Sequence, residues 1–314
     1  MTHPTTGRPA RRTLLTAGAA GAATALAAAG PAAAAPATRR GDGPPRADGG
    51  PALAARLRRL EREHTARLGV FARNLATGRT VLHRADERFP MCSVFKPLAA
   101  AAVLRDLDRC GEFLDHRIRY GPADLVAHSP VTGTAAHLAD GMTVAELCDA
   151  ALRFSDNTAA NLLLRQIGGP TGVTRFCRSA GDTVSRLDRW ETELNSAEPW
   201  RVEDTTTPRA IAGTYTRLLV GRALRGRDRR RLTAWMLANT TSAERFRAGL
   251  PADWDLADKT GGGSYGTNND VGVAWTPDGT PVVLAVLTTR PDPDAAADNP
   301  LIAETATLLS TTLT

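Results

Sequence analysis

The first regular hydrophobic pattern in the chain has helical spacing and predicts an amphipathic helix that ends at Gly69. Its apolar positions are Leu53, Leu57, Leu60 and Leu68. Two stretches of strand-forming residues follow, Gly69–Leu75 and Arg79–Arg84. The residues between them, Ala76-Thr77-Gly78, are typical of a turn, so the pair predicts a β-hairpin.

Strand spacing returns near the end of the chain. Asp270–Thr276 and Pro281–Thr289 flank Asp278-Gly279, which is a strong signal for a hairpin turn. Asp298-Asn299-Pro300 then predicts the start of a last helix. Because strands occur near both ends of the chain, we expect them to pair in one antiparallel sheet that the terminal helices cover. The apolar face of the last helix is formed by Leu301, Ile302, Thr305, Leu308 and Leu309.

Between these ends, from about Met91 to Leu237, the pattern is mainly helical. Thr143 and Glu146 have the spacing of a capping box and mark the start of one helix. Glycines indicate where a further helix ends, and a proline indicates where another helix begins. The predicted helices lie or begin at Val144–Phe154, Thr158–Ile167, Thr207-Pro208 and Asp228–Leu237.

This order of elements predicts an α+β fold. We expect an α/β lobe over about residues 52–90 and 238–314, in which terminal helices cover the antiparallel sheet. An all-helical lobe over about residues 91–237 is inserted into it. A cleft between two such lobes is the usual place for a small-molecule site, so we expect the active site there.

Composition limits the classes of function. The chain has 314 residues, of which 42% are hydrophobic and 23% charged, so it can bury a large core. Its net charge of +6 is weak for a nucleic-acid-binding protein, whose basic residues should also gather on one face. No apolar run long enough to span a membrane follows the N-terminal segment. We therefore expect no nucleic-acid partner and no membrane contact after that segment is removed. We also expect the protein to be a monomer.

Residues 1–37 have the features of an export signal. Arg11-Arg12 precedes an apolar, alanine-rich stretch from Leu14 to Ala35, and Ala35-Pro36-Ala37 has the form of a cleavage site. Paired arginines at this place favour the twin-arginine route, so we expect a secreted protein. Residues 38–51 have the composition of a flexible linker rich in glycine, proline and arginine.

The cysteine and histidine positions favour no metal site. The cysteines Cys92, Cys110, Cys148 and Cys177 contain no C-x-x-C pair, and the histidines have no H-x-H or H-E-x-x-H spacing. We expect most of the cysteines to be buried free thiols. We also expect no metal and no cofactor.

Lysine is rare in this chain, and both copies fall within short motifs. There are 37 arginines but only two lysines, Lys96 and Lys259. A buried lysine can lose its proton whereas an arginine stays charged, so a position that remains lysine here is a candidate for chemistry. Lys96 belongs to an S-x-x-K motif with Ser93, and Lys259 to the run Asp258-Lys259-Thr260-Gly261-Gly262-Gly263.

Each motif has a chemical interpretation. Residues three apart share a helix face, so Lys96 is expected to reach the hydroxyl of Ser93. Pro97 restricts Ser93 to the start of the helix, where the helix dipole favours a developing alkoxide. Ser155-Asp156-Asn157 lies between two predicted helices, where such residues are also common caps. Small residues after Lys259 let a ligand approach the backbone closely.

In their order S-x-x-K, S-D-N and K-T-G, the motifs make the sequence resemble the serine penicillin-recognising enzymes, and specifically the class A β-lactamases. The resemblance covers about residues 52–314. It implies hydrolysis of the β-lactam amide bond of penicillin- and cephalosporin-type antibiotics through a serine acyl-enzyme, which confers resistance. Further segments that resemble the family are Ser129-Pro130-Val131-Thr132, Asp140-Gly141-Met142-Thr143-Val144 and Asp204-Thr205-Thr206-x-Pro208.

A segment that begins at Arg189 determines the subfamily. The run from Arg189 to Asn195, RWETELN, resembles the start of the class A Ω-loop, where a glutamate and an asparagine hold the hydrolytic water. By this resemblance Glu191 and Asn195 activate the water that releases the product. Arg189 and Asp204 are expected to close the loop as an ion pair.

The resemblance also implies the other roles. Ser93 is the nucleophile, and the backbone N–H groups of Ser93 and Gly262 form the oxyanion hole. Ser155 passes a proton to the leaving nitrogen. Lys96 and Glu191 share proton transfer during acylation, and which of them is the base stays open. The substrate-binding residues are Asn157 for the side-chain amide, Lys259, Thr260 and Arg245 for the carboxylate, Gly261, and His128 at the mouth.

Three positions depart from the commonest family pattern. Thr192 follows Glu191 where a proline often stands, which leaves the geometry of that peptide bond open. His128 replaces an aromatic residue at the mouth. Ala100 stands where some relatives have a cysteine that pairs with the equivalent of Cys148.

Two alternative functions stay open at the level of the sequence. A D,D-carboxypeptidase or transpeptidase of cell-wall synthesis would share the three motifs but lack the Glu191 segment. A non-hydrolysing β-lactam sensor would need a membrane span to signal, and none remains after cleavage of the export signal. The motifs do not rank penicillins, cephalosporins and carbapenems as substrates.

Overall fold

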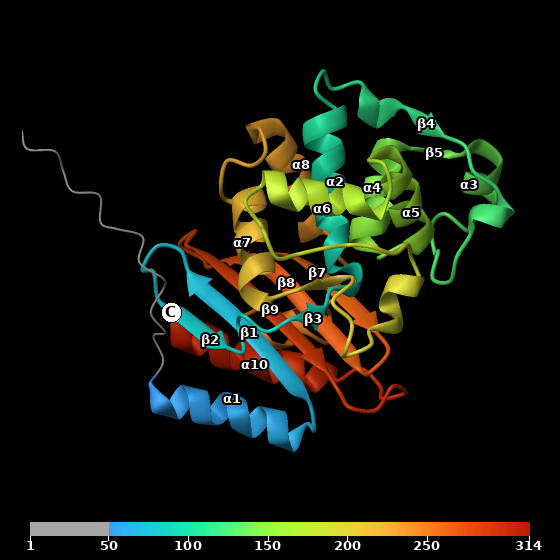
Figure 1. Ribbon diagram of the computed structural model, residues 1–314. Coiled ribbons are helices and arrows are strands. Elements are labelled where there is room, and N and C mark those ends of the chain that lie inside the picture. The colour runs from blue at the N-terminus through green and yellow to red at the C-terminus, as the bar shows by residue number, and fades with distance from the viewer. Residues whose placement is uncertain (1–49) are drawn as a thin grey trace, which may run out of the picture. The chain divides into compact units, whose positions relative to one another are not determined.

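The structure is a computed structural model that describes residues 50–314. The predicted export signal and all but the end of the predicted linker lie outside the described residues. A five-stranded antiparallel sheet with the strand order β2-β1-β9-β8-β7 forms the centre of the fold (Figure 1). Its strands are β1 (Arg67–Asn74), β2 (Thr80–His83), β7 (Asp255–Gly263), β8 (Thr267–Trp275) and β9 (Pro281–Thr289).

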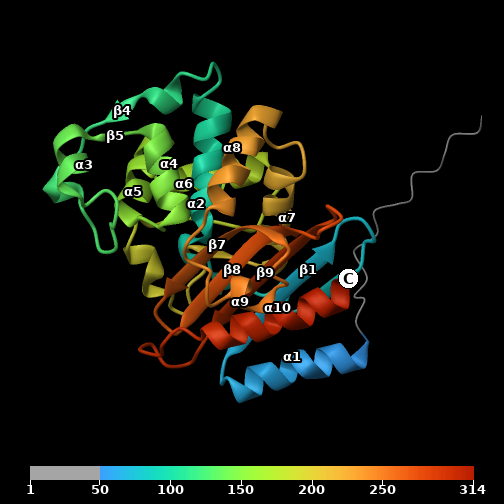
Figure 2. The same cartoon turned by 180° about the vertical axis from the view of Figure 1, so that it is seen from behind.

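Both faces of the sheet are buried, because alternate residues of its central strand pack against different layers. In β9, the even-numbered residues from Val282 to Val286 share a hydrophobic cluster with α1 (Pro51–Glu63) and α10 (Asn299–Leu313). The odd-numbered residues from Val283 to Leu287 belong to a second cluster, which includes α7 (Pro208–Leu219). Figures 1 and 2 show α1 and α10 on one side of the sheet and α7 on the other.

Most helices between residues 91 and 237 pack around α2 (Lys96–Ala102), all of whose residues are buried. In contrast, α7 belongs to this part of the sequence but packs against β1, β8 and β9. None of the helices within residues 50–314 has the length and apolar character needed to cross a membrane. The other elements are β3 (Phe89–Pro90), η1 (Cys92–Phe95), η2 (Val103–Leu107), η3 (Phe113–Asp115), β4 (Arg117–Ile118), η4 (Pro122–Asp124), α3 (Ala135–Asp140), β5 (Met142–Thr143), α4 (Val144–Arg153), α5 (Asn157–Gln166), α6 (Pro170–Ser179), η5 (Glu193–Ser196), β6 (Thr205–Thr206), α8 (Gly226–Leu237) and α9 (Phe246–Gly249).

Several helices start where their cap residues predict. The Thr143 hydroxyl accepts a hydrogen bond from the Glu146 N–H (3.2 Å), and the Glu146 carboxylate accepts one from the Thr143 N–H (2.7 Å), so the capping box is confirmed. The side chains of Thr207 and Asp298 likewise accept backbone hydrogen bonds at the starts of α7 and α10. The predicted α+β class, with terminal helices over an antiparallel sheet, is confirmed.

The predicted end of the first helix is wrong. Helix α1 ends at Glu63, and Leu68 lies in β1. Thr65 has a left-handed backbone conformation (φ 46°) and turns the chain between the two elements. Leu68 fits helical spacing because, as an alternate residue of a strand, it packs in the same hydrophobic cluster as Leu57 and Leu60.

Strand β7 is an element that the hydrophobic pattern does not predict. Its centre contains Asp258, Lys259 and Thr260, which are polar and nevertheless buried. The strand lies at the edge of the sheet and contacts η1, the turn that contains Ser93. The edge strand therefore brings one lysine motif next to the other.

Candidate active site

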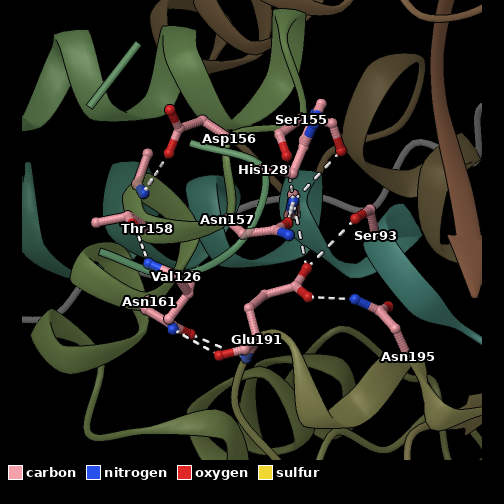
Figure 3. A network of polar contacts seen from close by, with 12 residues as sticks. Ser93, Val126, His128, Ser155, Asp156, Asn157, Thr158, Asn161, Glu191 and Asn195 are labelled. Atoms are coloured by element: carbon pink, nitrogen blue, oxygen red, sulfur yellow. Dashed lines mark hydrogen bonds and ion pairs between the residues drawn. The ribbon is translucent and has the colours of Figure 1, made fainter. Parts of the chain in front are cut away.

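A cleft of about 320 Å³ lies where η1, β7, η5 and the segment before α5 meet. It contains most of the residues that the motifs predict, together with Thr241, which no motif indicated. Figure 3 shows the polar contacts at its base. Its lining residues are Ser93, His128, Ser155, Asn157, Asn195, Thr241, Arg245, Thr260, Gly261 and Gly262.

Ser93 lies in η1, immediately before α2, as Pro97 in the first turn of α2 predicts. Its side chain is at the base of the cleft, and the residue is 7% exposed. Ser93 Oγ donates a hydrogen bond to Glu191 Oε1 (3.3 Å; Figure 3). The hydroxyl is therefore in contact with a carboxylate that can accept its proton.

Lys96 is fully buried at the first position of α2. Its Nζ donates to the backbone oxygen of Ser155 (2.8 Å), to Ser155 Oγ (3.3 Å) and to Asn157 Oδ1 (2.6 Å), and it lies 3.2 Å from Glu191 Oε1. Burial lowers the pKa of Lys96, although the Glu191 carboxylate acts in the opposite direction. The expected hydrogen bond between Lys96 and Ser93 does not form, because these other acceptors surround the ammonium group.

Glu191 is buried, with 4% of its surface exposed. Its Oε1 contacts Ser93 and Lys96, and its Oε2 accepts a hydrogen bond from Asn195 Nδ2 (2.6 Å). Asn161 of α5 holds the Glu191 backbone at both the N–H (3.0 Å) and the oxygen (2.8 Å; Figure 3). No motif indicated Asn161, although it lies one helical turn after the predicted Asn157. The peptide bond between Glu191 and Thr192 is cis.

The loop that carries Glu191 is closed by Arg189 and Asp204. Arg189 Nε lies 2.6 Å from Asp204 Oδ2, and this ion pair joins the two ends of the loop. Asp204 Oδ1 also accepts hydrogen bonds from the backbone N–H groups of Asp188 (2.7 Å) and Arg189 (3.0 Å). Asp204 is buried, so its charge depends on these donors.

The segment Ser155-Asp156-Asn157 divides into a structural residue and two site residues. Asp156 caps α5 by accepting a hydrogen bond from the Ala159 N–H (2.8 Å), and it also binds the backbone and hydroxyl of Thr132. Ser155 and Asn157 line the cleft and contact Lys96. The capping interpretation is thus right for Asp156.

Ser155 Oγ accepts hydrogen bonds from both lysines, from Lys96 at 3.3 Å and from Lys259 at 3.0 Å. A hydroxyl that accepts from two ammonium groups keeps its own proton free to donate. Lys259 is fully buried in β7, and its Nζ also donates to the Thr260 oxygen (2.8 Å). Burial lowers the pKa of Lys259 well below its ordinary value, and the charges of Lys96 and Arg245 lower it further.

Arg245, Thr241 and Thr260 form one side of the cleft. The Arg245 guanidinium donates to the backbone oxygens of Asn269 (3.0 Å) and Gly261 (3.3 Å), which fixes it beside β7 and β8. Burial lowers the pKa of Arg245. The hydroxyls of Thr241 and Thr260 lie 2.5 Å apart. Two hydroxyls and a guanidinium form a suitable site for a carboxylate.

The glycines that follow Thr260 allow three segments to meet. A Cβ on Gly263 would lie 2.5 Å from the backbone oxygen of Asn195 and 2.9 Å from Cys92 Sγ, so a larger residue would displace η5 or η1. A Cβ on Gly261 would lie 3.2 Å from the Ser93 nitrogen. Gly262 has more room, since its Cβ would have no contact closer than 3.7 Å, and it lines the cleft.

His128 is exposed at the edge of the cleft with a left-handed backbone (φ 59°). Its Nε2 lies 3.1 Å from the oxygen of Phe154.

All four cysteines are free thiols; Cys110 is exposed and the other three are buried. Within residues 50–314, no three His, Cys, Asp or Glu side chains gather in a way that could hold a metal ion.

The chain is similar to proteins of one family over nearly its whole length. Residues 52–313 match the family model described as "Beta-lactamase enzyme family". The chain is 63% identical to a protein named β-lactamase of Streptomyces lavendulae over 98% of this chain and 99% of that protein. It is 64% identical to one of Streptomyces fradiae over 99% of each. The solved β-lactamase structure from Streptomyces albus G superposes with a TM-score of 0.83 at 61% identity, covering 84% of this chain and all of that one.

Proposed function

The chain belongs to the β-lactamase enzyme family, as a class A serine enzyme that hydrolyses β-lactams, and from this premise we propose the role of each site residue. Ser93 Oγ attacks the carbonyl carbon of the lactam ring and forms a serine ester. The backbone N–H groups of Ser93 and Gly262 stabilise the oxyanion that develops. The lactam C–N bond then breaks and opens the ring.

The protons follow the contacts at the base of the cleft. Glu191, in contact with both the Ser93 hydroxyl and Lys96, accepts the proton of Ser93 directly or through Lys96. Ser155 gives its proton to the nitrogen that leaves the carbonyl, because its oxygen already accepts from two lysines. The proton taken from Ser93 restores Ser155 through Lys96, which donates to Ser155 Oγ.

Release of the product needs a water next to the ester. Glu191 and Asn195 hold this water, and Glu191 takes its proton while the oxygen attacks the ester carbon. The ester C–O bond breaks, and Ser93 recovers a proton from Glu191. A hydrolase differs from an enzyme that stays acylated in having an additional carboxylate that activates water. Glu191 fits that role because its Oε1 lies 3.3 Å from Ser93 Oγ.

Substrate binding uses the other side of the cleft. Lys259, Thr260 and Arg245 bind the carboxylate of the substrate, with Thr241 as an additional hydroxyl and Gly261 giving room. Asn157 binds the substrate side-chain amide, and His128 contacts the substrate at the mouth.

One observation carries this proposal: Ser93 Oγ, Lys96 Nζ and Asn195 Nδ2 all contact one buried carboxylate, Glu191. Hydrolysis of a chromogenic cephalosporin by the purified protein tests it, with Ser93→Ala as the matched variant. We expect turnover with the native protein and none with Ser93→Ala. Turnover that survives this substitution would contradict the assignment of the nucleophile.

We also propose that the protein is secreted, with residues 1–37 as a twin-arginine export signal. Its support is the order of sequence features: paired arginines, an alanine-rich apolar stretch and an A-x-A site. Replacement of Arg11-Arg12 by Lys-Lys is expected to abolish β-lactamase activity in the medium while the protein stays in the cells. Unchanged secretion would exclude the twin-arginine route.

A further inference from the structure

Two aspartates lie directly behind the carboxylate-binding side of the cleft, and the reaction scheme gives them no role. Asp258 precedes Lys259 in β7, and Asp270 lies opposite Thr260 in β8. Both residues are 0% exposed. A buried carboxylate is costly unless it is paired or neutralised, so the presence of two in contact requires a physical reason.

Asp258 pairs with Gly272, which lies two residues after Asp270, so the two carboxyl groups are diagonal neighbours on one face of β7 and β8, and each acts on the pKa of the other. Asn239 Nδ2 donates to Asp258 Oδ2 (3.1 Å), and the Phe246 N–H donates to Asp270 Oδ2 (3.1 Å). Both Oδ1 atoms are buried without a donor of ordinary hydrogen-bond geometry in the described part of the chain, although the Ser242 hydroxyl lies beside Asp258. A hydrogen bond between two carboxyl groups needs a proton on one of them, since two carboxylates are only acceptors.

Lys259 is a fully buried cation and Arg245 a half-buried one, and the hydrogen bonds that both cations donate go to neutral groups. Asp258 and Asp270 supply opposite charge that acts on both of them. Burial raises the pKa of Asp270 well above its ordinary value, and the neighbouring Asp258 raises it further. The neutral acceptors of the two cations are Ser155 Oγ, Asn299 Oδ1 and the backbone oxygens of Thr260, Gly261 and Asn269.

Two further titratable groups face the aspartates. Arg247 of α9 acts on Asp258, but it is exposed and donates to backbone oxygens. Tyr215 of α7 is fully buried, and burial followed by the charges of the two aspartates raises its pKa well above its ordinary value. Its hydroxyl donates to the Val94 oxygen, so it stays neutral.

The aspartates connect to the cleft through two short paths. On one side, Asn239, held by Asp258, accepts hydrogen bonds at Oδ1 from the Thr241 N–H (3.0 Å) and hydroxyl (2.8 Å). Thr241 in turn contacts Thr260. On the other side, Asp270 holds the N–H of Phe246, the residue that follows Arg245. The pair therefore supports both the hydroxyls and the guanidinium of the carboxylate site.

We propose that Asp258 and Asp270 share one proton and act together as a single positioning charge for the carboxylate site. One negative charge against Lys259 and Arg245 leaves a net charge of +1, which matches one substrate carboxylate. Two ionised carboxylates would cancel the positive charge and weaken substrate binding. The assignment rests on the proposed binding roles of Lys259 and Arg245.

The test is a cycle of the variants Asp258→Asn, Asp270→Asn and the double variant, with benzylpenicillin as substrate. In either single variant the amide N–H replaces the shared O–H and the pair keeps its single charge. We therefore expect KM and kcat within about threefold of the native protein, because one hydrogen bond replaces another of the same shape. If both aspartates were ionised, each single substitution would instead add positive charge to the site and lower KM.

The double variant removes the last negative charge behind Lys259. Loss of the Lys259 proton is expected to raise KM at alkaline pH. Because the double variant lowers the pKa of Lys259 further, we expect this rise in KM to occur at a pH lower by about one unit or more, with a smaller change in kcat. Asp228→Asn, a buried aspartate of α8 outside the cleft, is the control and should leave the pH profile in place. Thermal melting of each variant checks that it is folded.

Difference infrared spectroscopy gives a second readout that needs no substrate. The native protein minus either single variant is expected to show the C=O stretch of a protonated carboxyl group at neutral pH. Absence of this band would overturn the shared proton. A single variant with a KM clearly below that of the native protein would overturn it as well. If the band is present but the double variant keeps the native pH profile of KM, the positioning role is overturned. Hydrolysis that depends on Ser93 would stand in either case.

Discussion

Substitution of Glu191 by Gln separates the two halves of the reaction. Glutamine keeps the size of the side chain but cannot take a proton from water. Ser93 and Lys96 stay in place, since Lys96 Nζ keeps its hydrogen bonds to Asn157 Oδ1 (2.6 Å) and to the Ser155 backbone oxygen (2.8 Å). Acylation is expected to continue at a reduced rate, whereas hydrolysis of the ester should nearly stop.

The expected magnitude follows from the contacts that are lost. Removal of a positioned general base costs a factor of about 10²–10⁴ in rate, or about 3–5 kcal/mol in activation free energy. The larger value is expected here, because Glu191 accepts hydrogen bonds at both oxygens, from Ser93 at Oε1 and from Asn195 Nδ2 at Oε2 (2.6 Å), and the NH2 group of glutamine would remove one of these acceptors. Both the base and the water-holding geometry are then disturbed.

The assay is rapid mixing with excess benzylpenicillin, followed by intact-protein mass spectrometry. The variant should give a burst of about one product per active site and a covalent adduct of the mass of the antibiotic. Glu193→Gln is the matched control, because Glu193 lies in the same loop but is exposed. Many rapid turnovers without the adduct in Glu191→Gln would refute the argument and show that another residue activates the water.

Three more substitutions test the site and the fold. Lys96→Arg should reduce the acylation rate by at least about 10²-fold, because the guanidinium keeps its proton and exceeds the buried space; a native rate in stopped-flow acylation would contradict this. Arg245→Ala should raise KM for penicillins by about 10–100-fold through loss of about 1.5–3 kcal/mol of charge-assisted binding, and steady-state kinetics with an unchanged kcat/KM would exclude the contact. Burial alone would raise the pKa of Asp182, but hydrogen bonds from Ser185 and Thr214 outweigh it and lower the pKa. Its contribution to stability is therefore fully present above the ordinary aspartate pKa of about 3.9 and is lost as the pH falls through the lowered pKa of the folded protein, so Asp182→Asn should lower Tm at pH 7 more than at pH 3.

Local interactions made much of the fold predictable from the sequence. The capping box of Thr143 and Glu146 and the cap at Asp298 depend on residues three positions apart, so their sequence spacing is enough. Leu68 shows the limit of this reasoning, because a strand residue and a helix residue can face the same core and share a spacing. Strand β7 escaped prediction because its buried residues are polar, and their burial depends on partners in distant segments.

For the site, the sequence determined which residue types were present and in which order, and this was enough to indicate the family through Ser93, Lys96 and Lys259. Only the tertiary structure decided what each group contacts: the ammonium of Lys96 turns to Asn157 and Glu191, which lie 61 and 95 positions further along the chain. Thr241 carries no motif, and it joins the site because β7 brings Thr260 to it. Contacts of this kind depend on how strands and helices pack, and a spacing along the chain does not contain that information.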